Sequence, residues 1–323
     1  MSDREQRAGV ELTNLDQQLG PDAGATKRDL IDYLDAIADS MLPGLVQRPL
    51  TVLRVLRGRE AFMQKNVPKY TPEWVATVPV WAAASHREIR YPLCNDRRTL
   101  LWLANQRAIE YHPALGLADD IYRPTHLVID LDPPTGDDFA AVVAVAHLVR
   151  QVLDDCGLRG AVKTSGSRGL HVFVPIDDAA PVDDVAAATR AIAARAEALD
   201  PGLATTAFIV EDRGGRVFVD ATRSGGATVV AAYSPRWRPG MPVSFPVAWS
   251  DLDRVRPADF TVHTAVGLAA DGRRSWTADM PAAQRLPADL IEQGRTIPVA
   301  RVAAMHEGKR RARARRAESG PAD

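Results

Sequence analysis

The chain has 323 residues, of which 46% are hydrophobic and 25% are charged, and its formal net charge is −1. This length suffices for one large domain or two moderate ones, and the composition is that of a globular protein with a substantial core. The near-neutral charge excludes attraction to nucleic acid by overall charge alone. The two cysteines, Cys94 and Cys156, exclude a disulfide framework and a four-cysteine zinc site. Without a signal peptide or an apolar run of the roughly 20 residues that span a membrane, a cytoplasmic protein is expected.

Both ends of the chain differ in composition from its middle. Residues 1–24 are polar without clear periodicity and predict a flexible lead-in. Residues 301–323 contain the basic run GKRRARARR and predict a solvated, disordered tail that would attract polyanions. One folded domain is therefore expected over residues 25–300.

The first half of this domain is predicted to combine helices with short strands. Apolar residues at helical spacing, such as Leu30 and Leu34, predict a helix over 25–42. Thr26, with Asp29 three residues later, has the spacing of a capping box at its start. The same kinds of pattern predict strands over 49–58, 61–66, 77–83 and 108–113 and a helix over 95–107.

The second half is predicted to contain longer helices. Thr135 and Asp138 form a second capping box before a helix that ends near Gly157, and Pro181 opens a helix that ends near Leu199. Further predicted elements are strands over 126–132, 160–164, 170–176, 215–221 and 227–234 and a helix over 287–294. Because strands and helices do not alternate regularly, the expected fold class is α+β, with mixed sheets flanked by helices.

Two carboxylates end the apolar stretch HLVIDLDPP. Side chains alternate between the faces of a strand, so Asp130 and Asp132 point the same way. Two like charges this close repel, and a hard divalent cation such as Mg²⁺ or Mn²⁺ would supply the counter-charge. Asp220 ends another apolar strand and offers a third ligand for a two-metal site. The alternatives are a strand end that meets water and, for Asp220, a turn cap.

The stretch KTSGSRGLHVFVP has the features of an anion-binding loop. Its glycines permit close backbone approach, while backbone amides, hydroxyl groups and the Arg168 guanidinium bind phosphate oxygens. His171 begins the next strand and would reach the same anion if its face turns toward the loop. Together with the nearby carboxylates, these residues indicate a nucleoside triphosphate site that lacks the Walker pattern. An ordinary turn and a core histidine are the alternatives.

Three further cationic residues fit the same class of ligand. Arg223 follows Asp220 by three residues, and Arg236 lies in a predicted turn beside Trp237. Lys27 lies in the first turn of a predicted helix, where the macrodipole disfavours cations but the backbone amides bind anions. A phosphate at this helix start would explain the lysine, and ordinary surface charge is the alternative at all three positions.

Five stretches of the chain, taken together and in order, resemble the polymerase domain of bacterial ligase D. They are YPLCNDRRTLLWLANQRAIEYHP, HLVIDLDPP, KTSGSRGLHVFVP, FVDATRSGGATVVAAYSPRWRPG and RPADFTVHTA. The resemblance implies the archaeo-eukaryotic primase-polymerase fold, with the active site in a central cleft of a catalytic domain over 25–300. No Lys-x-Asp-Gly stretch of a ligase adenylation site occurs. We therefore expect a stand-alone enzyme similar to the free-standing actinobacterial paralogues of this domain.

The resemblance also implies roles for individual residues. By resemblance, Asp130, Asp132 and Asp220 are catalytic and hold two Mn²⁺ or Mg²⁺ ions. The residues implied to contact the incoming nucleotide are His112, Ser165, Arg168, His171, Arg223 and Arg236. Those implied to contact DNA are Lys27 at the 5′-phosphate across a gap and Phe62 and Lys65 at the template. The chain departs from the family pattern at Met63, Arg168, Ala221 and Ser224.

The activity implied by the resemblance is template-dependent addition of ribo- or deoxyribonucleotides to a primer 3′-hydroxyl, in gap filling or end-joining repair. One cation would activate the hydroxyl and the other would neutralise the leaving pyrophosphate. The implied partners are gapped or 3′-overhanging DNA with a 5′-phosphate, nucleoside triphosphates, and end-joining proteins such as Ku and a ligase, in association with the nucleoid. Two alternatives stay open: a phosphohydrolase of the haloacid dehalogenase type, which also places Asp-x-Asp after a strand, and a non-catalytic nucleic-acid-binding protein.

Overall fold

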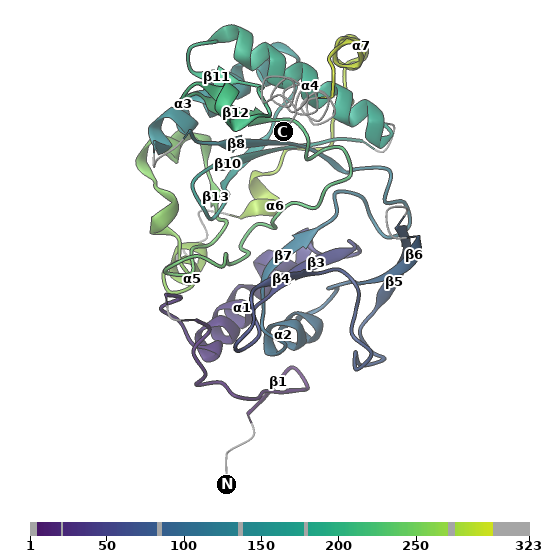
Figure 1. Cartoon of the computed structure of the whole chain (residues 1–323), viewed down its shortest axis with the longest axis vertical. Helices are drawn as coiled ribbons and strands as arrows, with labels where there is room; N and C mark the ends of the chain where they lie inside the picture. The colour runs from purple at the N-terminus through teal and green to yellow at the C-terminus, as the bar shows by residue number, and fades with distance from the viewer. Residues whose placement is uncertain are drawn as a thin grey trace, which may run out of the picture.

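The computed structural model describes residues 5–20, 22–82, 86–134, 138–177, 180–270 and 275–299. Two sheet-containing halves lie one above the other in Figure 1. The strands are β1 (Gln6–Arg7), β2 (Val10–Glu11), β3 (Leu50–Arg54), β4 (Phe62–Gln64), β5 (Thr77–Ala82), β6 (Arg87–Pro92), β7 (Ala108–Pro113), β8 (His126–Asp132), β9 (Ala161–Thr164), β10 (Leu170–Pro175), β11 (Ala204–Thr205), β12 (Val217–Asp220) and β13 (Pro246–Val247). The α-helices are α1 (Lys27–Met41), α2 (Arg97–Asn105), α3 (Phe139–Asp155), α4 (Val182–Leu199), α5 (Ala265–Ala270), α6 (Trp276–Asp279) and α7 (Ala288–Thr296).

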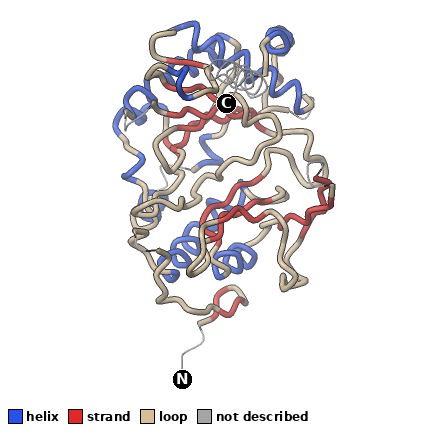
Figure 2. The backbone as a smooth tube through the Cα atoms, viewed as in Figure 1, coloured by secondary structure: helices blue, strands red, loops and turns tan. Residues whose placement is uncertain are grey.

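The upper half is a six-stranded sheet in the order β11-β12-β8-β10-β9-β13, with α4 and α7 at the top and α3 at the left (Figure 1, Figure 2). β11 and β12 are parallel and the other neighbouring strands are antiparallel, so the predicted mixed sheet is confirmed. Leu127, Ile129 and Leu131 of β8 are fully buried, and α3 and α4 contact this strand. Because side chains alternate, Asp130 and Asp132 point to the opposite face, toward the lower half.

The lower half is a three-stranded sheet in the order β4-β3-β7, packed with α1 and α2, with the β5–β6 hairpin at its side (Figure 1). The predicted capping box of α1 is confirmed: the Asp29 N–H donates to Thr26 Oγ1 at 3.2 Å, and the Thr26 N–H donates to Asp29 Oδ2 at 2.7 Å. β6 escapes prediction because its residues are mostly charged or exposed, and only Ile89 and Pro92 are buried.

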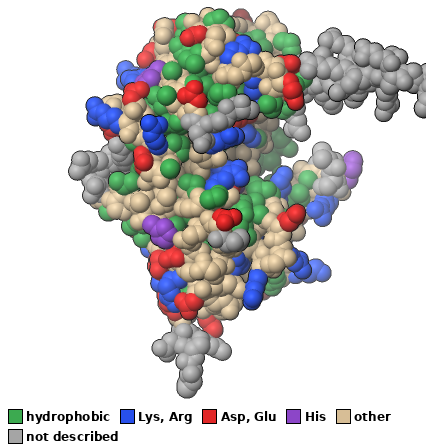
Figure 3. Space-filling model, turned by 60° about the vertical axis from the view of Figure 1, so that its left-hand side comes forward, with side chains coloured by type: hydrophobic (Ala, Val, Ile, Leu, Met, Phe, Trp, Pro, Cys, Tyr) green, Lys and Arg blue, Asp and Glu red, His purple; other side chains and the backbone are tan. Residues whose placement is uncertain are grey.

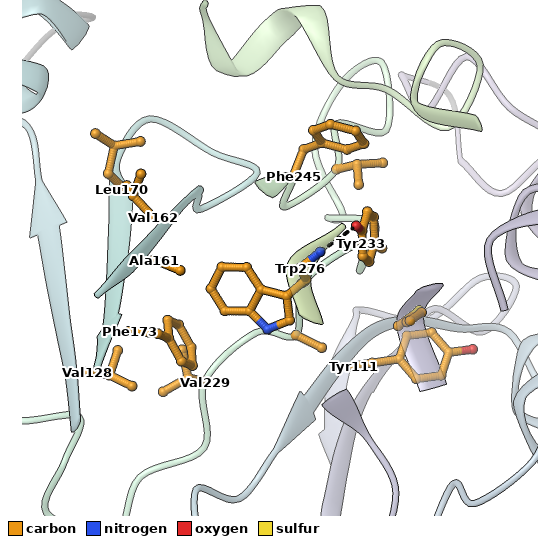
Figure 4. Close-up of a cluster of buried hydrophobic side chains, with 14 of the residues drawn as sticks. Tyr111, Val128, Ala161, Val162, Leu170, Phe173, Val229, Tyr233, Phe245 and Trp276 are labelled. Carbon is orange, nitrogen blue, oxygen red and sulfur yellow. Dashed lines mark hydrogen bonds between the residues drawn. The ribbon is translucent and has the colours of Figure 1, made fainter. Parts of the chain in front are cut away.

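An aromatic cluster joins the two halves (Figure 4). Phe173 of β10 meets Trp276 of α6 edge to face, with ring centroids 5.2 Å apart. The Trp276 N–H donates to the Tyr233 hydroxyl oxygen at 3.1 Å, and the Tyr33 hydroxyl of α1 donates to the Tyr233 carbonyl at 2.7 Å. Tyr233 is fully buried, so the segment that follows β12 anchors the upper half to α1 of the lower half.

The strand predicted over 227–234 does not form. The N–H groups of Val229 and Ala231 donate to carbonyls of Pro113 and Tyr111 on the lower sheet, at 3.2 and 2.9 Å. The segment then turns, and Tyr233 adopts a positive φ of 65°. Its apolar residues are buried because it passes between the two halves, and this burial, rather than a regular ladder, produces the strand-like pattern.

The prediction of a flexible lead-in over residues 1–24 is wrong for the described part of this segment. The side chains of Leu12, Leu15 and Leu19 are buried in the core. The Arg107 guanidinium also donates to the carbonyl of Leu19 at 2.8 Å and to Gln17 Oε1 at 2.7 Å. These leucines are spaced by three and four residues, as on one face of a helix, but the segment forms no helix, so their burial comes from tertiary contacts rather than from a regular element.

Two other predictions concern residues that the structure does not describe. The predicted basic tail, 301–323, lies outside the described residues, and so does Thr135 of the second capping box. α3 is instead seen to be capped by Asp138, whose Oδ1 accepts the Ala141 N–H at 3.0 Å. Among the described parts of the chain, no helix combines the length and apolarity needed to cross a membrane.

If residues 5–20 belong to the core, truncating a buried leucine there should destabilise the whole protein. Leu12 is 4% exposed, so Leu12→Ala should lower the free energy of unfolding by about 2–3 kcal/mol in urea denaturation. Asp22→Ala, at an exposed position two residues beyond this segment, is the matched control and should change the free energy of unfolding by less than about 0.5 kcal/mol. Equal effects of the two substitutions would contradict this packing.

Candidate active site

Ionisable side chains form a row across four neighbouring strands of the upper sheet. Asp220 on β12 lies directly opposite Asp130 on β8, which in turn lies opposite His171 on β10. His171 lies opposite Lys163 on β9. Directly opposed residues share a face of the sheet, and all four side chains are buried. The row therefore runs from acidic groups at β12 and β8 to basic groups at β10 and β9, where solvent screens their charges little.

Arg223 lies between two of the aspartates. Its Nε is 3.0 Å from Asp130 Oδ2 and 3.4 Å from Asp220 Oδ2. The other Asp130 oxygen, Oδ1, is 3.2 Å from His171 Nε2. Burial opposes ionisation of Asp130, but its contacts with His171 and Arg223 outweigh burial and hold its pKa well below the ordinary value.

Asp132 lacks comparable compensation. Burial, and then the charges of Asp130 and Asp220, raise its pKa to about 6, against the weaker opposing charges of Arg223 and Arg213. The cluster therefore carries more negative charge than its neighbouring cations balance.

His171 is held on its other side by the basic end of the row. The Lys163 amine is 2.9 Å from His171 Nδ1 and donates to Ser244 Oγ at 2.6 Å. Burial, and then the Lys163 charge, lower the pKa of His171 to about 4, so the imidazole is neutral at pH 7. The predicted orientation of His171, on the face of Phe173, is confirmed, and this face carries it to Asp130.

The loop between β9 and β10 is closed by its own serine. Ser165 Oγ accepts the N–H groups of Ser167 and Gly169 at 3.2 and 3.1 Å. Gly166 has a φ of +68°, and a Cβ there would lie 2.6 Å from Arg236 Cγ. A Cβ on Gly169 would overlap the Leu131 carbonyl oxygen of β8. Only glycine fits at these two positions, so the loop is packed tightly beside the aspartate strand.

A polar bridge connects this loop to the lower sheet. The Arg236 Nη1 donates to the Ser165 carbonyl at 2.5 Å, and its Nε lies 3.1 Å from Glu110 Oε2. Glu110 also contacts His112 Nε2 at 2.8 Å and accepts the Trp237 N–H at 2.8 Å. The bridge places His112 and Arg236, predicted from separate stretches, around a common carboxylate. Although burial opposes it, these contacts lower the pKa of Glu110 to about 2.

The remaining predicted site residues lie outside both the row of ionisable side chains and the polar bridge. They are Lys27, Phe62, Lys65 and Arg168. Lys27 is 2% exposed and its ammonium donates to the Thr13 carbonyl at 2.5 Å, while burial lowers its pKa to about 8. Phe62 on the edge strand β4 is 39% exposed, and Lys65 follows the strand at an exposed position. Arg168 is exposed and, with Arg238, lines an open pocket of about 660 Å³.

Several residues of the site were not among the predicted ones. Glu110 precedes His112 by two residues on β7, so a period of two places it on the same face. Ser244 carries no local signal, because only the folding of a distant segment against β9 brings it to Lys163. Arg213 lies with its guanidinium 4.0 Å above the Phe218 ring, and Phe218 is opposite Asp132 in the sheet.

The donor set fits a hard divalent cation. Within the described residues, no three carboxylate, imidazole or thiol groups already converge on a point that could hold a metal ion. Asp130 and Asp220 nevertheless both contact the Arg223 guanidinium, and burial together with their charges raises the pKa of Asp132, so a bound cation would favour its ionised form. Asp130, Asp132 and Asp220 would hold the cation once Arg223 leaves its position between two of them.

Residues 26–276 match the family described as the LigD primase-polymerase domain. The bifunctional non-homologous end joining protein LigD of Bacillus subtilis is 33% identical over 262 residues, 80% of this chain and 42% of the relative. The multifunctional non-homologous end joining protein LigD of Mycobacterium bovis is 35% identical over 294 residues, 86% of this chain and 38% of the relative. The chain thus spans about two fifths of the length of these curated relatives.

A solved structure, the polymerase domain from Mycobacterium tuberculosis ligase D in complex with DNA, superposes with a TM-score of 0.75 at 34% identity. The match covers 86% of this chain and 100% of that one. The chain therefore belongs to the LigD primase-polymerase domain family, a class of metal-dependent nucleotidyltransferases. This membership confirms the predicted fold and excludes the haloacid dehalogenase alternative.

The electrostatics of the cluster predict a stability change at Asp132. The folded protein holds the Asp132 proton to a higher pH than the unfolded chain does, so this contribution to stability is lost as the pH rises from about 4 to about 6. After a discount for solvent screening, Asp132→Asn should stabilise the metal-free protein by about 1 kcal/mol at pH 7 and by less at pH 4, measured by urea unfolding. Asp155→Asn, at an exposed position, is the control. A loss of stability in Asp132→Asn at pH 7 would show that the cluster is fully compensated.

Proposed function

We propose that the chain is a template-dependent polymerase that adds ribo- or deoxyribonucleotides to a primer 3′-hydroxyl during gap filling or end joining of DNA. The observation that carries the proposal is the row of Asp220, Asp130 and His171 beside the closed Ser165 loop. It places a cation-binding group next to an anion-binding group, as transfer of a nucleotide from a triphosphate requires. Family membership supports the same reaction class.

Two divalent cations, Mn²⁺ or Mg²⁺, would supply the charge that activates the primer hydroxyl and neutralises the leaving pyrophosphate. Asp130 and Asp220 each present an oxygen that now contacts Arg223, and these oxygens would turn to the cations. Asp132 must be ionised to take part, and a pKa of about 6 permits this at neutral pH. The released Arg223 guanidinium would then be available for a phosphate oxygen.

The triphosphate would lie along the Ser165 loop. The tight backbone at Gly166 and Gly169 permits close approach, and Arg168 and Arg236 would contribute positive charge from either side. His112, held by Glu110 on the lower sheet, would contact the nucleotide from the opposite half. A nucleotide bound in this way would lie between the two sheets.

Contacts with DNA would involve the lower half. Phe62 and Met63 of β4 are 39% and 47% exposed and would offer an apolar surface on which template bases stack, with Lys65 at the phosphate backbone. Lysine and arginine side chains are also spread over the face shown in Figure 3, with a group near the middle of the molecule. A 5′-phosphate would reach the Lys27 ammonium by replacing the Thr13 carbonyl.

End-joining proteins such as Ku and a ligase are the proposed partners, because the relatives of greater length are end-joining proteins. A cytoplasmic, nucleoid-associated location would follow from action on chromosomal DNA. Non-catalytic DNA binding is the alternative that the next experiment separates.

The test is extension of a primer on a 5′-phosphorylated gapped DNA with nucleoside triphosphates and Mn²⁺. The wild-type protein should give template-dependent products. Asp130→Ala should reduce extension by at least about 10³-fold because it removes a carboxylate from the reacting centre, with DNA affinity by mobility shift changed less than about threefold. Asp155→Asn is the control. DNA binding without extension by the wild type would favour the non-catalytic alternative, and extension by Asp130→Ala at the wild-type rate would refute the assigned site.

Arg236 should act on nucleotide binding. Arg236→Ala removes the contact with the Ser165 carbonyl and leaves Glu110 with one cationic neighbour fewer, so the loop loses its anchor. We expect the KM for the nucleotide to rise about tenfold or more, with a smaller change in kcat, in steady-state extension assays. Arg254→Ala removes an exposed arginine and is the control. A fall in kcat with KM unchanged would instead place Arg236 at the transition state.

A further inference from the structure

Lys163 is a buried amine that the proposed reaction does not use. Its side chain is 0% exposed, and burial lowers its pKa well below the ordinary value. Its described polar contacts are Ser244 Oγ at 2.6 Å and His171 Nδ1 at 2.9 Å, and its Nζ lies 5.4 Å from the Phe173 ring centroid. Burying an amine is costly, so its contacts have to repay that cost.

The hydrogen bonds around Lys163 have only one consistent direction. The single hydroxyl hydrogen of Ser244 is donated to the Thr164 carbonyl at 2.7 Å, so Ser244 Oγ accepts from Lys163. At the other end, an ionised Asp130 can only accept, so His171 Nε2 must carry the proton that faces Asp130 Oδ1 at 3.2 Å. A neutral imidazole has one N–H, so Nδ1 accepts from Lys163.

From this direction of donation we propose that Lys163 is a positioning residue, which together with Ser244 fixes His171 in the tautomer with its proton on Nε2 and thereby orients Asp130. The proposal rests on the proposed function only in taking Asp130 as a cation ligand.

The orientation has a consequence for the carboxylate. With Oδ1 of Asp130 engaged by His171, the oxygen left for a cation is Oδ2, the one that now contacts Arg223. The register of β8, β10 and β9 places Asp130, His171 and Lys163 in line, and all three are buried, so the row has little freedom to relax. Groups that orient a metal ligand in this way typically contribute 10- to 100-fold to metal affinity.

The tautomer can be read directly by NMR of protein labelled with ¹⁵N-histidine, using long-range ¹H–¹⁵N spectra at pH 7, with His171→Asn identifying the His171 signals. The wild type should show a protonated Nε2 and an unprotonated Nδ1. Lys163→Met, which keeps side-chain length without a donor, should shift the Nδ1 signal because Nδ1 loses the hydrogen bond from the amine. A wild-type His171 that carries its proton on Nδ1, or a His171 spectrum unchanged in Lys163→Met, would overturn the proposal.

Binding of Mn²⁺ alone, measured by electron paramagnetic resonance, gives the second readout. Lys163→Met should weaken Mn²⁺ binding about 10- to 100-fold. Thr189→Val removes a buried hydroxyl in α4 that donates to the Val185 carbonyl at 2.7 Å, and this control should leave both Mn²⁺ affinity and the His171 spectrum unchanged. Unaltered Mn²⁺ affinity in Lys163→Met would show that the lysine only fills space.

A second variant and the choice of readouts allow the role of Lys163 to be tested even if Lys163→Met does not fold or the protein is not a polymerase. If Lys163→Met does not fold, Ser244→Ala removes one anchor of the amine and should change the His171 spectrum in the same direction by a smaller amount, while no change would count against the proposal. Neither readout requires DNA or nucleotide. If the wild type fails to extend primers while Lys163→Met changes both the His171 spectrum and the Mn²⁺ affinity, the polymerase function is refuted and the role of Lys163 stands. If the wild type extends primers while Lys163→Met changes neither quantity, the role of Lys163 is refuted and the polymerase function stands.

Discussion

Electrostatic repulsion among Asp130, Asp132 and Asp220 is the constraint on which the site depends. All three occupy one face of the upper sheet, on neighbouring strands, and two of them are buried. Burial makes their mutual repulsion stronger than it would be at the surface. The protein lowers this repulsion with Arg223 between Asp130 and Asp220, and it leaves Asp132 with a raised pKa. Binding of a cation would therefore lower the electrostatic free energy of the three aspartates.

The sheet itself arranges the opposing charges. Strand pairing sets acidic groups on β12 and β8 beside basic groups on β10 and β9, and no flexible loop intervenes between Asp220, Asp130 and His171. The Ser165 loop leaves the sheet at the basic end. The proposed cation-binding and anion-binding regions are thus joined rigidly, which would favour a nucleoside triphosphate with its metal ions over either ligand alone.

The two halves of the molecule are connected through the same loop. Glu110 of the lower sheet holds Arg236, and Arg236 holds the Ser165 carbonyl of the upper half. The buried Tyr233, with Trp276 and Phe173, adds an apolar connection close by (Figure 4). Because a change in the lower sheet would reach the Ser165 loop through these contacts, the proposed binding of DNA to the lower half and the proposed binding of nucleotide to the upper half are expected to influence each other.

Local patterns in the sequence were enough to predict most of the elements and the types of side chain at the candidate site. Strand alternation placed Asp130 and Asp132 on one face, the Thr26–Asp29 spacing marked the start of α1, and the glycines marked the tight loop before His171. These features depend on neighbours within a few residues, so the sequence contains them directly. Three features became visible only in the folded chain: the pairing of Asp220 with Asp130, the presence of Glu110 and Ser244 at the candidate site, and the burial of the leucines of residues 5–20. Each of these depends on contacts between segments far apart in the chain, and their register and burial are set by how the whole molecule packs.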